Sequence, residues 1–231
     1  PLLLVLIGII IRGTAFTFRY YDTVKDNPHS YYSWFFRISS LLTPFFLGII
    51  LGAVMLGRIP AAPEGNFFEV FLNPWLNYFT ITTGTFLTLL FSWIASVYLV
   101  GETEEDTYKL FARTSLLLFV LLIISGLCVF LAAEYYHLHL FKQFEHSLLS
   151  IASVILATAL IPIMWRNITR KNIFWIRLLA GLQTTCILIG WFAVQFPVMI
   201  YLADGKHLTI WNSQAPEKTM FYLLLALVVG I

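Results

Sequence analysis

Long apolar stretches separated by short polar loops dominate this chain of 231 residues. Seven stretches follow one another, and they run about 19 to 26 residues, the length at which a helix crosses roughly 30 Å of hydrocarbon. They lack the alternation of apolar and polar residues that is typical of membrane barrel strands. Because backbone N–H and C=O groups in a bilayer must be satisfied within the protein, the pattern predicts an all-α polytopic membrane protein, a transmembrane helix bundle.

The pattern predicts five complete spans and two truncated ones, with approximate ends. The expected helices cover residues 1–18, 34–57, 74–100, 110–133, 147–165 and 173–202, with a last helix beginning near Lys218. In the third helix Asn73 is the expected N-cap and Pro74 the first helical residue. In the sixth, Pro197 is expected to kink or end the helix.

Residues 1–231 form one predicted transmembrane domain, because no soluble domain, linker or low-complexity tract interrupts the apolar pattern. The chain begins at Pro1 and ends inside an apolar run at Ile231, so we interpret it as a fragment of a longer protein. Hydrophobic residues make up 59% of the chain and charged residues 11%, against about 25% charged residues in a soluble domain. The net charge of +2 gives no indication of a nucleic-acid partner, and we expect none.

The distribution of basic residues predicts the orientation. Ten lie at or near the loops after the first, third and fifth helices: Arg12, Arg19, Lys25, Arg37, Lys109, Arg113, Arg166, Arg170, Lys171 and Arg177. The other side has four: Arg58, Lys142, Lys206 and Lys218. By the positive-inside rule, the loops at 19–33, 101–109 and 166–172 are expected to be cytoplasmic.

Arg12 lies unusually deep in an apolar stretch. If the first helix continues past it, Arg12 is about 10 Å from Arg19 along the axis. A guanidinium at membrane depth costs about 3 kcal/mol on insertion scales, so it normally faces protein or extends to the headgroups. Arg12, Phe16 and Arg19 share one helix face. Two interpretations stay open: Arg12 snorkels to the cytoplasmic headgroups, or it has a buried partner, such as a cofactor carboxylate or an acidic side chain.

Other polar and small residues fall into two groups. The first is interpreted as helix packing: Gly48, Gly52, Thr80, Gly84, Thr88 and Ser92. The second contains candidates for a polar path, with helix packing as the alternative: His146, Ser150, Ser153, Gln183 and Gln195. His137 and His139 are interpreted as solvated histidines of an outer loop, and Cys128 and Cys186 as small core residues. We find no spacing typical of a metal cluster or a catalytic triad, so no catalytic residue and no metal site is expected.

Four local patterns recur in order along the chain. The first helix closes with Arg-Gly-Thr-Ala-Phe-Thr-Phe-Arg at 12–19, and the second carries glycines at 48, 52 and 57. An outer loop ends in Phe-Phe-Glu-Val-Phe-Leu-Asn-Pro at 67–74, and Phe196-Pro197 precedes Leu-Thr-Ile-Trp-Asn at 208–212. In this order the patterns resemble subunit II of the cytochrome bd-type quinol oxidases, over what is similar to that family's third to ninth helices.

The resemblance implies a non-haem subunit of a quinol oxidase that reduces oxygen to water in aerobic respiration. It implies a haem-bearing subunit I as partner, which carries the b- and d-type haems, so that this chain binds none directly. Quinol is then the substrate of the complex, and quinone is a further candidate ligand. The implied location is the plasma (inner) membrane of a bacterium or archaeon. Two other classes stay open: a secondary transporter or channel, and a structural membrane assembly protein. Polar stripes favour a transporter, whereas the lack of an evident internal repeat argues against it.

Overall fold

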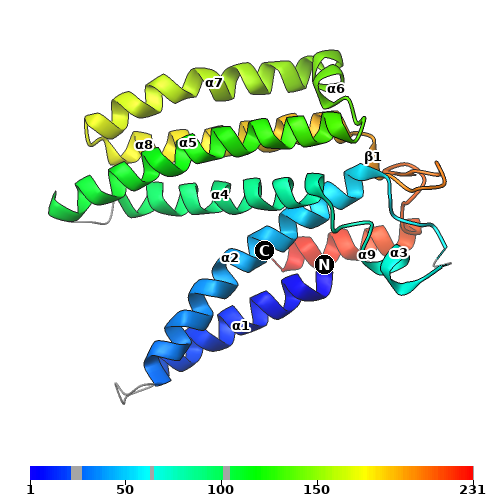
Figure 1. Cartoon of the computed structure of the whole chain (residues 1–231), viewed down its shortest axis with the longest axis horizontal. Helices are drawn as coiled ribbons and strands as arrows, with labels where there is room; N and C mark the ends of the chain where they lie inside the picture. Colours follow the sequence, from blue (N-terminus) through cyan, green and yellow to red (C-terminus); the bar gives the residue numbers. More distant parts are fainter. Residues whose placement is uncertain (22–27, 63–64, 101–104, 231) are drawn as a thin grey trace.

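The computed structural model describes residues 1–21, 28–62, 65–100 and 105–230 (Figure 1). This part of the chain is almost entirely helical, with one short antiparallel pair of strands. The helices are α1 (Leu2–Tyr21), α2 (Pro28–Leu56), α3 (Phe67–Phe71), α4 (Tyr78–Val100), α5 (Glu105–Tyr135), α6 (Leu140–His146), α7 (Leu148–Thr169), α8 (Ile173–Gln195) and α9 (Glu217–Val229). The strands are β1 (Val198–Ile200) and β2 (Leu208–Thr209). The all-α polytopic fold is confirmed.

Six of the described helices are long and apolar enough to cross a membrane: α1, α2, α4, α5, α7 and α8. The number of full-length spans is therefore one higher than expected, because α1 has 20 residues and qualifies by itself. Helix α9 has 13 residues, which is fewer than the roughly 17 to 25 residues of a transmembrane helix.

The six span-length helices form two groups. Helices α4, α5, α7 and α8 run roughly alongside one another, whereas α1 and α2 form a hairpin that diverges from them at an angle (Figure 1). Helix α2 belongs to both groups, since it packs against α1 on one side and α4 on the other. The C-terminal ends of α1, α4 and α7 lie at one end of the molecule, and those of α2, α5 and α8 lie at the other (Figure 1). This alternation places at one end the three helix ends that lead into the most basic stretches of the sequence.

Two clusters of buried side chains hold the bundle together. One surrounds Trp93 of α4 and includes residues of α5, α7 and α8. The other surrounds Phe79 at the opposite end of α4, with contributions from α2, α5 and α6. Trp93 and Phe79 are 1% and 0% exposed, so α4 supplies the central residue of each cluster.

The start of α4 differs from the sequence prediction. The helix begins at Tyr78 rather than Pro74, and residues 72–77 form turns. The N-cap is Asn77, because its Oδ1 accepts a hydrogen bond from the Thr80 backbone N–H at 3.1 Å. The N–H of Asn73 donates instead to Phe68 O at 2.9 Å, which closes the short helix α3. The backbone groups of residues 72–77 are thus used in a local turn, and α4 cannot begin at Pro74.

The end of α8 lies before the predicted bound at Leu202, whereas the expectation that Pro197 ends the helix is confirmed. Gln195 ends the helix, and the chain passes through Phe196 and Pro197 into β1 rather than staying helical to Leu202. Since proline lacks an N–H and restricts the residue before it, the helix stops there. Strand β1 then pairs with β2, with Val198 opposite Thr209. At the same end of the α7–α8 pair, the predicted start of α7 is close to the observed one, and Ser147 is its N-cap.

Candidate functional site

A half-open cavity of about 230 Å³ has walls from α4, α5, α6, α7 and α8, and its lining includes the exposed side chains of Ile123 and Val154. It forms because α5 is held against its neighbours at two separate places. At one end Trp93 and Phe119 pack with ring centroids 5.3 Å apart, and the Tyr108 hydroxyl donates to Ile168 O at 2.5 Å. At the other end Phe130 of α5 packs against Phe144 of α6, with centroids 5.3 Å apart. Between these contacts the helices leave the cavity.

Gln183 is the most deeply buried polar side chain of the cavity wall. It is 4% exposed, and its Oε1 has no hydrogen-bond partner within the described part of the chain. By the rise of an α-helix, its Cα lies about 15 Å from the start of α8 and about 18 Å from its end. The amide is therefore near the middle of the span.

Trp191 contains a second buried polar atom without a partner in the described part of the chain. Its indole Nε1 is buried and, among the described residues, has no acceptor. Trp191 lies eight residues after Gln183 on α8, and both side chains line the cavity. Two residues of a largely apolar wall thus each contain one buried polar atom that has no partner among the described residues.

The structure divides the predicted polar-path residues. Ser153 lines the cavity with Gln183, but its hydroxyl donates to Leu149 O at 2.7 Å. The Ser150 hydroxyl donates across the helix pair to Gly190 O at 3.2 Å, and Gln195 Nε2 donates to Met199 O at 2.8 Å. These three polar groups therefore bond to backbone carbonyls. His146 ends α6, and its side chain lies outside the part that the structure describes.

The predicted packing residues lie where α2 crosses α4. A Cβ added to Gly48 would lie 2.7 Å from the Cα of Gly84, and one added to Gly84 would lie 2.8 Å from Phe45 O. A Cβ added to Gly52 would lie 3.1 Å from the Cα of Thr80. The backbones thus approach so closely that only glycine fits. Thr88 and Ser92 lie further along α4 and donate to the carbonyls of Gly84 and Thr88, at 2.9 and 2.8 Å.

The predicted face of α1 points away from the bundle. Arg12, Phe16 and Arg19 are all exposed, and the Arg12 Cζ lies 5.5 Å from the ring centroid of Phe36 on α2. Within the described residues, the structure pairs Arg12 with no carboxylate. The cation–π contact holds the guanidinium at the surface of the hairpin, where lipid or another protein chain can reach it.

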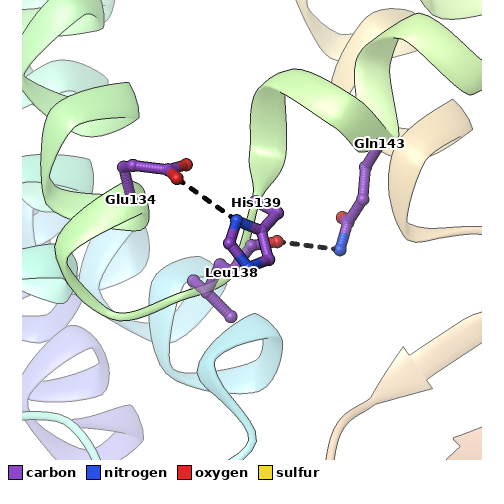
Figure 2. Close-up of polar contacts among 4 residues, drawn as sticks. All are labelled: Glu134, Leu138, His139 and Gln143. Carbon is purple, nitrogen blue, oxygen red and sulfur yellow. Dashed lines mark hydrogen bonds and ion pairs between the residues drawn. The ribbon is translucent and has the colours of Figure 1, made fainter.

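The turn between α5 and α6 contains a polar cluster. Figure 2 shows the Nδ1 of His139 facing Glu134, at 3.2 Å, and Gln143 Nε2 donating to Leu138 O at 3.0 Å. Both members of the His139–Glu134 pair are about half exposed. The pair closes the turn at the surface and has no connection with the cavity wall.

Sequence analysis does not single out Trp191 or Asn77. Thr80 follows Asn77 by three residues, which is the spacing between an N-cap and the residue whose backbone N–H donates to it. This pattern could have located the start of α4. Trp191 has no such signal, since a tryptophan near the end of an apolar helix is also typical of the membrane interface. Its role depends on how α5 and α8 are placed.

The chain matches the model of a known protein family. The family model described as Cytochrome bd terminal oxidase subunit II matches residues 1–231. A search of curated proteins finds no match. The family match extends over both groups of helices, the hairpin as well as the bundle.

Proposed function

Because the chain belongs to the family of cytochrome bd terminal oxidase subunit II, we propose that it is the non-haem subunit of a membrane-bound quinol:oxygen oxidoreductase. The observation that carries the proposal is the family match over residues 1–231. In the complex, two quinols give four electrons and four protons to one oxygen molecule, and two quinones and two waters form. The six candidate spans supply the multi-pass membrane anchoring that such a subunit needs.

We propose that subunit I, the haem-bearing partner, covers the exposed face of α1. Only Gly8 and Ala15 of α1 are buried within the chain. The face with Arg12, Phe16 and Arg19 is open, and a guanidinium in mid-span is costly unless protein or headgroups reach it. A carboxylate from the partner would satisfy it.

The b- and d-type haems belong, in this proposal, to subunit I, where they carry electrons and reduce oxygen. A b-type haem needs a histidine or methionine aimed into a dry pocket. His137 and His139 lie in the outer turn instead, and His139 pairs with Glu134. This chain then contributes no catalytic residue. Quinol acts as the substrate of the complex, and a quinone stays a candidate ligand of this chain.

The family match favours this function over the two alternatives, a transporter or channel and a structural assembly protein. The central cavity lies between two clusters of buried side chains, at Trp93 and at Phe79. That arrangement supports a packed membrane subunit rather than a conducting path.

Co-purification tests the proposal. The full-length protein with an affinity tag, purified from its own membrane in mild detergent, should retain a haem-bearing partner and show quinol-dependent oxygen consumption. The same protein expressed alone should bind no haem. A tagged preparation that carries no haem-bearing partner would contradict the oxidase assignment, and a haem bound by the isolated chain would contradict the division between the subunits.

The orientation is part of the proposal. We place the ends of α1, α4 and α7 on the cytoplasmic side of a bacterial or archaeal plasma membrane, because the basic loops lie there. In a variant without Cys128 and Cys186, an impermeant maleimide added to intact cells should label Ser213→Cys and spare Asn172→Cys. Both positions are exposed, so the opposite labelling pattern would reverse the orientation.

A further inference from the structure

An open recess of about 480 Å³ lies where α2 and α5 end and α4 begins. Polar and apolar side chains share its lining: Arg58, Asn73, Asn77, Tyr78, Tyr136, Leu76 and Ile81. We propose that the recess binds an anionic phospholipid of the leaflet at this end of the bundle, whose phosphodiester accepts hydrogen bonds from the Arg58 guanidinium. The proposal requires that the chain spans a membrane and is independent of the oxidase assignment.

Arg58 supplies the positive charge of the recess. It follows the end of α2 and is exposed, and its Cζ lies 4.7 Å from the ring centroid of Tyr136, just after α5. Within the described residues the guanidinium pairs with no carboxylate and donates no hydrogen bond. The contact with the ring restricts where the guanidinium lies but uses none of its five N–H donors. These donors are therefore available to a phosphate group, which a guanidinium can bind through two parallel hydrogen bonds.

Neutral donors lie in the same recess. The side-chain amide of Asn73 and the hydroxyls of Tyr78 and Tyr136 form no hydrogen bond within the part of the chain that the structure describes. Asn73 and Tyr78 are exposed, and Tyr136 is partly exposed. Asn77 differs from them, because its Nδ2 is buried and its Oδ1 caps α4. The three accessible side chains can thus donate to the oxygens of a headgroup that Arg58 holds.

The apolar side of the recess faces the bilayer. Leu76 and Ile81 are exposed, and Ile81 lies on the same side of α4 as Tyr78, because the two are three residues apart. Ile81 is in the first turn of a helix that is long enough to span the membrane, whereas Arg58 and Tyr136 lie beyond the ends of their helices. Tyrosines at helix ends are typical of headgroup depth. The guanidinium therefore lies at the level of the phosphates, and Ile81 lies beside the start of the acyl chains.

The charge of the recess selects among possible ligands. Its described lining contains one guanidinium and no carboxylate, so a phosphodiester is paired, whereas the ammonium of an ethanolamine or choline headgroup would have no acidic partner there. A soluble phosphate ion would pair with Arg58 but would leave Leu76 and Ile81 uncovered. A phospholipid without an ammonium, such as phosphatidylglycerol, matches both the polar and the apolar part.

Photo-crosslinking tests the site in the assembled protein. The full-length chain, purified in its membrane assembly and placed in nanodiscs of phosphatidylcholine, receives a small fraction of phosphatidylglycerol with a diazirine near the start of one acyl chain. After irradiation, peptide mass spectrometry should find the probe attached to residues 76–81. Unlabelled phosphatidylglycerol should compete the product away, whereas the same amount of phosphatidylethanolamine or of inorganic phosphate should not.

Three variants make the test specific. Arg58→Gln should lower the product at residues 76–81 about fivefold, which is the effect of one basic residue near a membrane surface. Arg58→Lys keeps the charge and should retain most of the product, because lysine binds phosphate as a point charge. Lys142→Gln is the matched control and should leave the product unchanged, since Lys142 is exposed on α6 and does not line the recess.

Four results would overturn the proposal. Equal competition by phosphatidylethanolamine would show that the headgroup charge is not read, and competition by inorganic phosphate would show that a free anion is the ligand. An unchanged product in Arg58→Gln would remove the role of the guanidinium. The absence of any product at residues 76–81 would show that something other than this lipid covers the recess. The competition series uses the unsubstituted protein, so it decides the question even if Arg58→Gln does not fold.

Discussion

Helix α4 and helix α1 are both apolar and of span length, yet they are used differently. Helix α4 has 23 residues, of which ten are buried within the chain, whereas α1 has 20 residues and buries only Gly8 and Ala15. Helix α4 packs against α2, α5 and α8, and α1 packs mainly against α2. In a bilayer the lipid-facing and protein-facing sides of a helix are equally apolar, so hydropathy identifies both spans but does not distinguish their surroundings.

Small residues mark the difference between the packed face of α4 and the open face of α1. Gly84 of α4 meets the backbone of α2 directly, while Gly13 of α1 has no atom within 4 Å of an added Cβ. Without a hydrophobic driving force between helices in lipid, close backbone approach and van der Waals contact provide much of the association. The bundle is therefore stabilised within the chain, whereas the outer face of α1 depends on what surrounds the chain.

The largest expected effect comes from Gly84→Leu. Its Cβ alone would lie 2.8 Å from Phe45 O, so α2 and α4 must separate, and overpacking of this kind costs about 1–3 kcal/mol or more. We expect loss of most folded protein in mild detergent, measured as the monodisperse fraction in size-exclusion chromatography and as a lower midpoint of thermal unfolding.

Gly13→Leu is the matched control, because it makes the same change on α1 in open space. It should leave the folded yield and the unfolding midpoint of the chain unchanged. If Gly13→Leu destabilised the chain as much as Gly84→Leu, the contrast between the two helices would be wrong.

The contrast also explains how much could be predicted from the sequence. The spans were predictable because length and hydropathy decide them. Small residues at helical spacing indicated packing faces on both helices, but they did not indicate that Gly48 would meet Gly84. The short elements α3, α6, β1 and β2 were not, since fewer than eight residues give no periodicity to identify. The cavity was not predictable either, because it depends on where Trp93 and Phe130 hold α5.

An intermediate effect is expected for Arg12→Gln. If the partner subunit supplies a buried acid, removing the arginine leaves that acid unpaired and costs about 3–5 kcal/mol of association, against under about 1 kcal/mol for an exposed pair. The haem that co-purifies with the tagged chain should then fall at least about tenfold, while the folded yield of the chain itself stays near the unchanged value.

Lys206→Gln provides the comparison for Arg12→Gln. Lys206 is exposed in the turn after β1, so its loss should change neither haem content nor oxygen consumption. Normal haem content and turnover in Arg12→Gln would show that Arg12 extends to the cytoplasmic headgroups, and α1 would then face lipid.

The smallest effect is expected where the two groups of helices are joined, near the C-terminal ends of α2 and α8. The Tyr201 N–H donates to Val54 O of α2 at 2.8 Å, and burial raises the pKa of Tyr201 above its ordinary value of 10.0. In the unfolded chain the phenol keeps the ordinary pKa, so it loses its proton first as the pH rises. The contribution of neutral Tyr201 to stability is thus complete below about pH 10 and is lost as the pH rises through the higher pKa of the folded state.

The measurement compares the unsubstituted protein with Tyr201→Phe. Between about pH 8 and about pH 11 the unfolding midpoint of the unsubstituted protein should fall more than that of Tyr201→Phe. From about pH 6 to about pH 9 the difference between the two midpoints should be constant. Equal losses in both proteins at alkaline pH would show that the Tyr201 hydroxyl does not influence this junction, and the bundle and the hairpin would then be joined by backbone contacts alone.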